Sequence, residues 1–136
     1  MRKWASAAVV AAASGSMILG LTAPAHAASR SRPYNAGNKY GDSAGTVKWG
    51  TAKKRGHYYV RVAGNVRDFK PNKTWTYVYL SWYVGKKKHN HQVIKVNNGQ
   101  ERNFTSKAYT FKGKPKKAMV TVCTETTWNW QCGRPA

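Results

Sequence analysis

The sequence predicts an all-β protein: a small antiparallel β-sandwich, immunoglobulin-like or barrel-like, with six or seven strands and one disulfide near the C-terminus. Short runs rich in Val, Thr, Tyr and Trp, which are enriched in strands, alternate with clusters of Gly, Asn, Pro and Lys. After the first 27 residues, no segment shows the long 3.6-residue periodicity of an amphipathic helix. The close spacing of the runs favours a sandwich or a barrel.

The N-terminus has the three parts of a secretory signal peptide. Arg2 and Lys3 come first, a mainly apolar run covers residues 5–21, and a small-x-small motif occupies residues 25–27. We expect cleavage after Ala27 and secretion of the mature chain. Such an extracellular compartment allows disulfides to form.

The mature chain is predicted to be one domain. Cleavage leaves 109 of the 136 residues and lowers the net charge from +20 to +18, because Arg2 and Lys3 are lost. Residues 28–45 are mainly small, polar and basic, so we expect a flexible basic N-terminal segment there and a single β-sandwich domain over residues 46–136. No apolar stretch after Ala27 approaches the roughly 18 residues that a spanning helix needs.

The strands are expected where β-forming runs lie between turn residues. In chain order they cover residues 46–52, 57–66, 75–84, 91–96, 103–111 and 118–124, with a short seventh strand at 128–131. Because successive side chains of a strand point to opposite sides, alternation assigns the faces. In the second strand, Tyr58, Val60 and Val62 share the face expected to meet the core.

The third strand carries an unusual number of aromatic residues. Its aliphatic side chains and Trp82 share one face, which is expected in the core. The opposite face carries Trp75, Tyr77, Tyr79 and Tyr83. Such a row can stack sugar rings or nucleobases, and cross-strand aromatic pairs also stabilise sheets without any ligand. Trp128 and Trp130, near the C-terminus, have the same two interpretations.

The two cysteines of the chain, Cys123 and Cys132, are both in the mature part. An even number of cysteines in a secreted domain favours a disulfide. Closing so short a loop would contribute about 2 to 3 kcal/mol in the chain-entropy model.

Basic clusters occupy alternate connections between the predicted strands. The clusters comprise Lys53, Lys54, Arg55, Lys86, Lys87, Lys88, Lys112, Lys114, Lys116 and Lys117. If every strand is antiparallel to its sequence neighbour, these connections lie at the same end of the domain. A positive end of this kind attracts polyanions, most strongly at low salt. Lysines in turns also solvate a surface and block edge pairing, which is the alternative.

Catalytic patterns are weak. His89 and His91 form an H-x-H pair that could bind a transition metal, but no third or fourth ligand is evident, so no metal site and no cofactor are expected. The chain has only four Asp and Glu residues to supply the two acids that a glycosidase needs, so this activity is not expected. A metal-free ribonuclease could draw on His57, the two other histidines, Glu101 and nearby lysines, although no motif joins them.

Several features resemble small secreted proteins of Streptomyces and related actinobacteria. They are the Ala-rich leader, a first strand at residues 45–50, an aromatic central strand at 77–82, and a last strand at 120–124 followed by a second cysteine. The resemblance covers most of the mature chain. It implies a compact extracellular β-sandwich with a late disulfide, and it brings no active-site residues.

These observations favour a secreted, non-enzymatic, monomeric protein that binds a polyanion through its lysine-rich end. Wall teichoic acid, nucleic acid and acidic polysaccharide are the candidate partners. A neutral-carbohydrate-binding module that uses the aromatic strand face is the alternative, and a secreted ribonuclease is a third function to distinguish.

Overall fold

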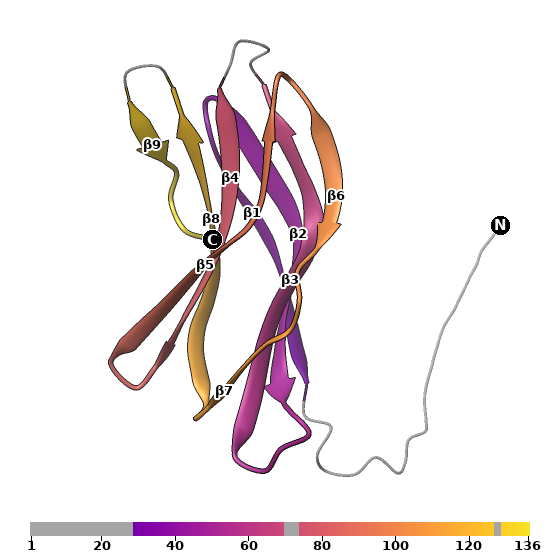
Figure 1. Ribbon diagram of the computed structural model, residues 1–136, viewed down its shortest axis with the longest axis vertical. Helices are drawn as coiled ribbons and strands as arrows, with labels where there is room; N and C mark the ends of the chain where they lie inside the picture. Colours follow the sequence, from indigo (N-terminus) through magenta and orange to yellow (C-terminus); the bar gives the residue numbers. More distant parts are fainter. Residues whose placement is uncertain (1–28, 70–73, 127–128) are drawn as a thin grey trace, which may run out of the picture.

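The computed structural model describes residues 29–69, 74–126 and 129–136. Strands form two antiparallel sheets packed face to face as a β-sandwich (Figure 1). The strands are β1 (Arg30–Asn38), β2 (Gly41–Thr51), β3 (His57–Asp68), β4 (Trp75–Val84), β5 (Lys87–Asn97), β6 (Glu101–Thr105), β7 (Tyr109–Lys112), β8 (Pro115–Glu125) and β9 (Trp130–Cys132). The predicted all-β sandwich is confirmed.

Each sheet has a long strand at its centre. The five-stranded sheet has the order β1-β2-β3-β6, and β7 pairs with β3 beside β6, so the two short strands share one edge of β3. The four-stranded sheet has the order β5-β4-β8-β9. Three connections, β2–β3, β4–β5 and β7–β8, lie together at the lower end of Figure 1, and the β1–β2 and β5–β6 connections lie at the upper end.

The core follows the alternation of the strands. Side chains at every second position of β3, β4 and β8 meet between the sheets, where an aliphatic set surrounds one large aromatic residue. The residues with at most 1% exposure include Val47, Val60, Val62, Val66, Val78, Leu80, Trp82, Val96, Val120 and Val122. Val and other β-branched residues suit this site because they pack on a pleated surface.

The prediction of a flexible segment over residues 28–45 is wrong. Residues 30–38 form β1, which pairs with β2 along its whole length, and β2 begins at Gly41. The polar composition suggested a flexible segment, but β1 is an edge strand with one solvated face and therefore needs few apolar side chains. Tyr34 and Ala36 are its buried contribution, and the Tyr34 hydroxyl is 2.8 Å from Ser43 Oγ.

The expected strand over residues 103–111 is two strands. β6 ends at Thr105, and β7 begins at Tyr109. The interruption occurs at Ser106, whose Oγ accepts a hydrogen bond of 3.0 Å from Val62 N in place of a backbone carbonyl. This split, together with β1, raises the number of strands from the expected six or seven to nine.

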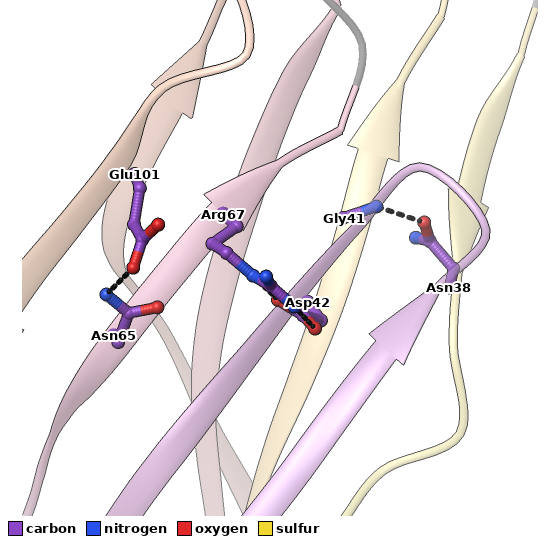
Figure 2. Close-up of polar contacts among 6 residues, drawn as sticks. All are labelled: Asn38, Gly41, Asp42, Asn65, Arg67 and Glu101. Carbon is purple, nitrogen blue, oxygen red and sulfur yellow. Dashed lines mark hydrogen bonds and ion pairs between the residues drawn. The ribbon is translucent and has the colours of Figure 1, made fainter.

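Asn38 connects the two sheets at the β1–β2 turn. Its Oδ1 accepts hydrogen bonds from Tyr40 N at 2.8 Å and Gly41 N at 3.2 Å, and Figure 2 shows the second of these. Its Nδ2 donates to Gln131 O at 3.2 Å and to Thr124 Oγ1 at 3.2 Å in the other sheet. An Asn side chain that replaces backbone partners in this way is typical of a tight turn.

The predicted disulfide joins Cys123 of β8 to Cys132 of β9, with an S–S distance of 2.02 Å. The two residues are direct register partners in adjacent strands. After β9 the chain continues beside β8, where Val120 and Ala136 exchange two backbone hydrogen bonds of 2.7 and 2.9 Å. The disulfide and these bonds hold the C-terminus on the four-stranded sheet.

Candidate functional site

The three basic clusters lie at one end of the sandwich. The β7–β8 connection reaches the β2–β3 connection through a hydrogen bond of 3.2 Å from Gly113 N to Gly56 O. It also lies beside the β4–β5 connection, because Val84 has Pro115 as its partner in β8 and Lys87 as its partner in β5. We call this end the lysine-rich pole; it comprises Lys53, Lys54, Arg55, Lys86, Lys87, Lys88, Lys112, Lys114, Lys116 and Lys117.

Every charged side chain of the lysine-rich pole is exposed. Within the described part of the chain, the single salt bridge joins Arg67 to Asp42, at 2.7 Å, and lies away from the pole. The charges of the pole are therefore balanced by solvent and counterions and not by carboxylates. Such a cluster raises the local concentration of anions.

A β-bulge places two consecutive lysines of β8 in solvent. The register of β4 and β8 shifts between Ser81 and Tyr83, opposite Lys116 and Lys117. Lys117 has a φ of 53°, in the left-handed region that residues other than Gly seldom occupy. In a regular strand, two successive side chains point to opposite faces, so the bulge is what exposes both.

Two arginines that the sequence analysis missed lie close to the pole. Arg30 and Arg32 come from β1, where the sequence predicted a flexible segment. Arg32 Nη2 donates to Ala118 O at 2.6 Å, which holds the guanidinium against β8. Arg32 and Lys117 line an open hollow of about 720 Å³ together with Trp49. Trp49 also lines two smaller adjoining hollows with Arg30 and Lys114.

All four carboxylates of the chain lie at the end opposite the pole. Arg67 Nε and Nη2 donate to the two carboxylate oxygens of Asp42 at 3.0 and 2.7 Å, and Asn65 donates to Glu101 at 2.9 Å (Figure 2). The Asp42 carboxylate also raises the pKa of the Arg67 guanidinium, mainly through these hydrogen bonds.

The remaining two acids lie at the same end. Asp68, which is 3% exposed, accepts hydrogen bonds from the hydroxyls of Thr74 and Thr76 and from Gly99 N. Glu125, the register partner of Trp75, accepts one from the Tyr77 hydroxyl at 2.8 Å. The Asp and Glu side chains of the molecule are thus confined to one end, where Arg67 and Arg102 lie among them.

The aromatic row lies on the outer face of the four-stranded sheet. Trp75, Tyr77, Tyr79 and Tyr83 are half-buried there, on the face of β4 opposite the core. Trp130 of β9 packs against this row, with its ring centroid 5.0 Å from Tyr77 and 6.3 Å from Tyr79. Trp130 remains 49% exposed, and Trp128 lies outside the described residues. We call Tyr77, Tyr79 and Trp130 the aromatic platform.

An open hollow of about 330 Å³ connects the platform with the pole. Tyr79, Trp130 and the disulfide line one part of it, and Asn90 and Lys88 line the other. Burial is the main cause that raises the pKa of Tyr77 to about 12, and the hydrogen bond to Glu125 acts in the same direction. The Tyr77 hydroxyl therefore stays protonated at neutral pH.

His89 and His91 do not form a metal site with a third ligand. Both imidazoles stack on the buried Trp82 indole with centroid distances of 5.3 Å, and His91 also stacks on Tyr109 at 4.5 Å. Within the described residues, no three His, Cys, Asp or Glu side chains lie close enough to hold a metal ion. Burial, the charge of His89 and that of Lys107 lower the pKa of His91.

The residues considered for a ribonuclease are not brought together. His57 and Arg67 are ten positions apart in β3, which corresponds to about 33 Å of strand. Glu101 is the register partner of Arg67, so it lies far from His57. His89 and His91 line a separate hollow with Trp82 and residues of β7, away from Glu101.

Comparison of the chain with protein-family models, with curated proteins and with solved structures finds no match. In the part of the chain that the structure describes, no helix has the length and apolar character needed to cross a membrane. The predicted signal peptide, residues 1–27 with cleavage after Ala27, lies outside the described residues.

Proposed function

We propose that this protein is a secreted, non-enzymatic module that binds polyanions through the lysine-rich pole. The observation that carries the proposal is the separation of charge: ten exposed cations occupy one end, and all four carboxylates occupy the other. A ligand at the pole meets no carboxylate of the chain. The candidate polymers are wall teichoic acid, nucleic acid and acidic polysaccharide.

Three properties of the pole support binding to a polymer. Its cations belong to three separate connections and to the strand ends beside them, so they can contact successive anionic groups of one chain. Most of them are lysines, which act as flexible point charges and adapt to irregular spacing. Arg30 and Arg32 extend the positive surface along β1, beside the hollows lined by Trp49.

The four carboxylates support a binding role over acid–base catalysis. Each has protein partners at the opposite end, and Asp42 and Glu101 are held by Arg67 and Asn65. Two carboxylates that flank a scissile bond need a site between them that a substrate can enter. The positive charge of the pole can attract an anionic polymer, but no Asp or Glu side chain lies there to transfer a proton to or from it.

The test removes one cluster of the pole and compares it with a charge-matched control. The Lys86→Gln/Lys87→Gln/Lys88→Gln variant should bind polyphosphate and duplex DNA more weakly than the parent. For DNA, the slope of log K against log salt should become shallower by up to about 2.7, since each neutralised phosphate contributes about 0.9. Fluorescence anisotropy at several salt concentrations measures both quantities.

The control variant is Lys39→Gln/Arg61→Gln/Arg102→Gln, which loses the same charge at exposed positions away from the pole. It should retain most of the affinity and most of the salt slope. Each exposed substitution should change the free energy of unfolding by no more than about 0.5 kcal/mol. Equal losses in the two variants would mean that net charge, and not the pole, determines binding, and the proposal would be wrong.

A further inference from the structure

We infer that the outer face of the four-stranded sheet is a binding site for an acidic polysaccharide, with an uncharged sugar ring on the aromatic platform and the neighbouring acidic group at Lys88. This inference rests on the proposed function, since Lys88 belongs to the lysine-rich pole. It names the chemical class of the polymer and says which end of the polymer's binding site takes the uncharged sugar and which takes the acidic group.

The aromatic platform provides the stacking surface. Tyr77 and Tyr79 point outward from β4, with ring centroids 6.3 Å apart and planes inclined by 27°. Trp130 packs on both rings from β9 and keeps half of its surface in solvent. The hydrogen bond from Tyr77 to Glu125 and the disulfide next to Trp130 in sequence hold these rings in position. Preordered rings lose little entropy on binding.

Polar groups follow the platform toward the pole. Tyr79 pairs with Thr121, and the next outward position of β4, Ser81, pairs with Asn90. Thr121 and Asn90 both line the hollow beside the platform. A hydroxyl and an amide can each donate and accept hydrogen bonds, as the hydroxyl groups of a sugar require. These groups distinguish this face from a surface that offers charge alone.

The cations come after the polar groups. Lys88 pairs with Tyr83, one further outward position along β4, and Lys117 Nζ lies 5.8 Å from the Tyr83 ring centroid. Tyr79 and Tyr83 are four positions apart, which corresponds to about 13 Å of strand. The platform, the polar groups and the two cations therefore extend over more than the width of one sugar ring, so a ligand that contacts all of them is a chain of sugars.

Glu125 sets the direction of that chain. It is the register partner of Trp130, and it lies at the end of the platform farthest from Lys88. An acidic sugar stacked on Trp130 would be close to a like charge, which disfavours it. The geometry therefore selects a polymer that alternates uncharged and acidic units over one in which every unit is charged.

The probes separate the stacking contribution from the charge contribution. Hyaluronan oligosaccharides alternate an uncharged sugar with an acidic one, polygalacturonate carries a charge on every ring, chito-oligosaccharides carry none, and polyphosphate has no ring. Isothermal titration calorimetry at moderate salt should give the highest affinity for hyaluronan. Trp130→Ala should weaken hyaluronan binding about tenfold or more and leave polyphosphate binding unchanged, since one stacked ring contributes about 1–3 kcal/mol.

Three further variants keep the test independent of folding. Trp130→Phe retains a ring and should restore most of the hyaluronan affinity, and Lys88→Gln should weaken hyaluronan and polyphosphate about threefold each. Phe69→Ala removes another exposed aromatic side chain, 45% exposed, from the chain after the other sheet's central strand β3, and should have no effect. Phe69 follows β3 directly.

Each contrary outcome has a separate meaning. If Trp130→Ala does not change hyaluronan binding while polyphosphate binding still depends on the pole, the inference is wrong and the proposed function stands. Chito-oligosaccharide binding as tight as that of hyaluronan would make the face a neutral-glycan site and overturn the inference. Tighter binding of oligothymidylate with the same dependence on Trp130 would assign the face to nucleic acid. If no polyanion binds, the proposed function fails as well.

Discussion

The two ends of the sandwich use charge in different ways. At the acidic end, each of the four Asp and Glu carboxylates is held by the protein: Asp42 by Arg67, Asp68 by two threonines, Glu101 by Asn65 and Glu125 by Tyr77. At the lysine-rich pole, ten cations are exposed, and no carboxylate of the chain lies among them. Charge at the first end contributes to the fold, whereas charge at the second is free to meet a ligand.

The difference follows from where hydrogen-bond partners are available. At the acidic end, carboxylates meet backbone N–H groups and hydroxyls of neighbouring strands, so burial of Asp68 is compensated by several bonds. At the pole, long lysine side chains project into solvent from the connections and from the strand ends beside them. Substitutions at the two ends should therefore act on different properties, stability at one and affinity at the other.

The largest effect on stability is expected from Asp68→Ala. This substitution removes the buried carboxylate that accepts hydrogen bonds from the Thr74 and Thr76 hydroxyls and from Gly99 N, and the loss of a buried hydrogen-bond partner costs about 1–3 kcal/mol. We expect a loss of about 3 kcal/mol in the free energy of unfolding, measured by urea denaturation. Polyphosphate binding by the folded fraction should not change.

Glu101→Gln is the matched control at the same end. Its side chain is exposed and can still accept the hydrogen bond from Asn65, so its loss of stability should stay near 0.5 kcal/mol or less. If the Asp68 and Glu101 variants were equally stable, burial would not distinguish these acids, and the structural role assigned to Asp68 would be incorrect.

An exchange of charge between the two ends tests the comparison at constant net charge. The Lys114→Glu/Glu101→Lys variant places a carboxylate at the pole and a cation at the acidic end. Polyphosphate affinity at low salt should fall about fivefold, which corresponds to about 1 kcal/mol, and the difference should shrink as salt rises. An unchanged affinity would show that the polymer responds to total charge and not to its position.

The position of the pole could be predicted from the sequence because it depends on two simple facts. Basic residues occupy alternate connections of the six predicted strands, and antiparallel neighbours return the chain to the same end. The division of the fifth predicted strand into β6 and β7 keeps this result, because both are antiparallel to β3. The faces of β3 and β4 were predictable for a similar reason, since side chains alternate along a strand. The structure confirms the core positions of Val60, Val62, Val78 and Leu80.

Other features depend on contacts between distant segments. The composition of residues 30–38 does not show that Tyr34 reaches Ser43, or that Asn38 bonds to the four-stranded sheet. The strand over residues 103–111 is interrupted because Ser106 bonds to Val62, a residue of another strand. Packing of Trp130 on Tyr77 likewise depends on the pairing of β9 with β8.

The smallest expected effect concerns His91 of β5. His91 stacks between Trp82 and Tyr109, and His89 and Lys107 are the charged groups that act on it. Its pKa in the folded protein is below the usual 6.5 of an unfolded histidine, mainly because of burial. The unfolded state therefore binds more protons as pH falls below about 6.5.

The sign of the pH dependence follows directly. The contribution of His91 to stability is complete above the unfolded pKa and is lost as pH falls through 6.5 toward the lower folded pKa. Urea denaturation between pH 7.5 and pH 4.5 should show a decrease in the free energy of unfolding, and His91→Gln should make that decrease smaller. A parent protein that becomes more stable toward pH 5, or a His91→Gln variant with the same pH dependence as the parent, would contradict this assignment.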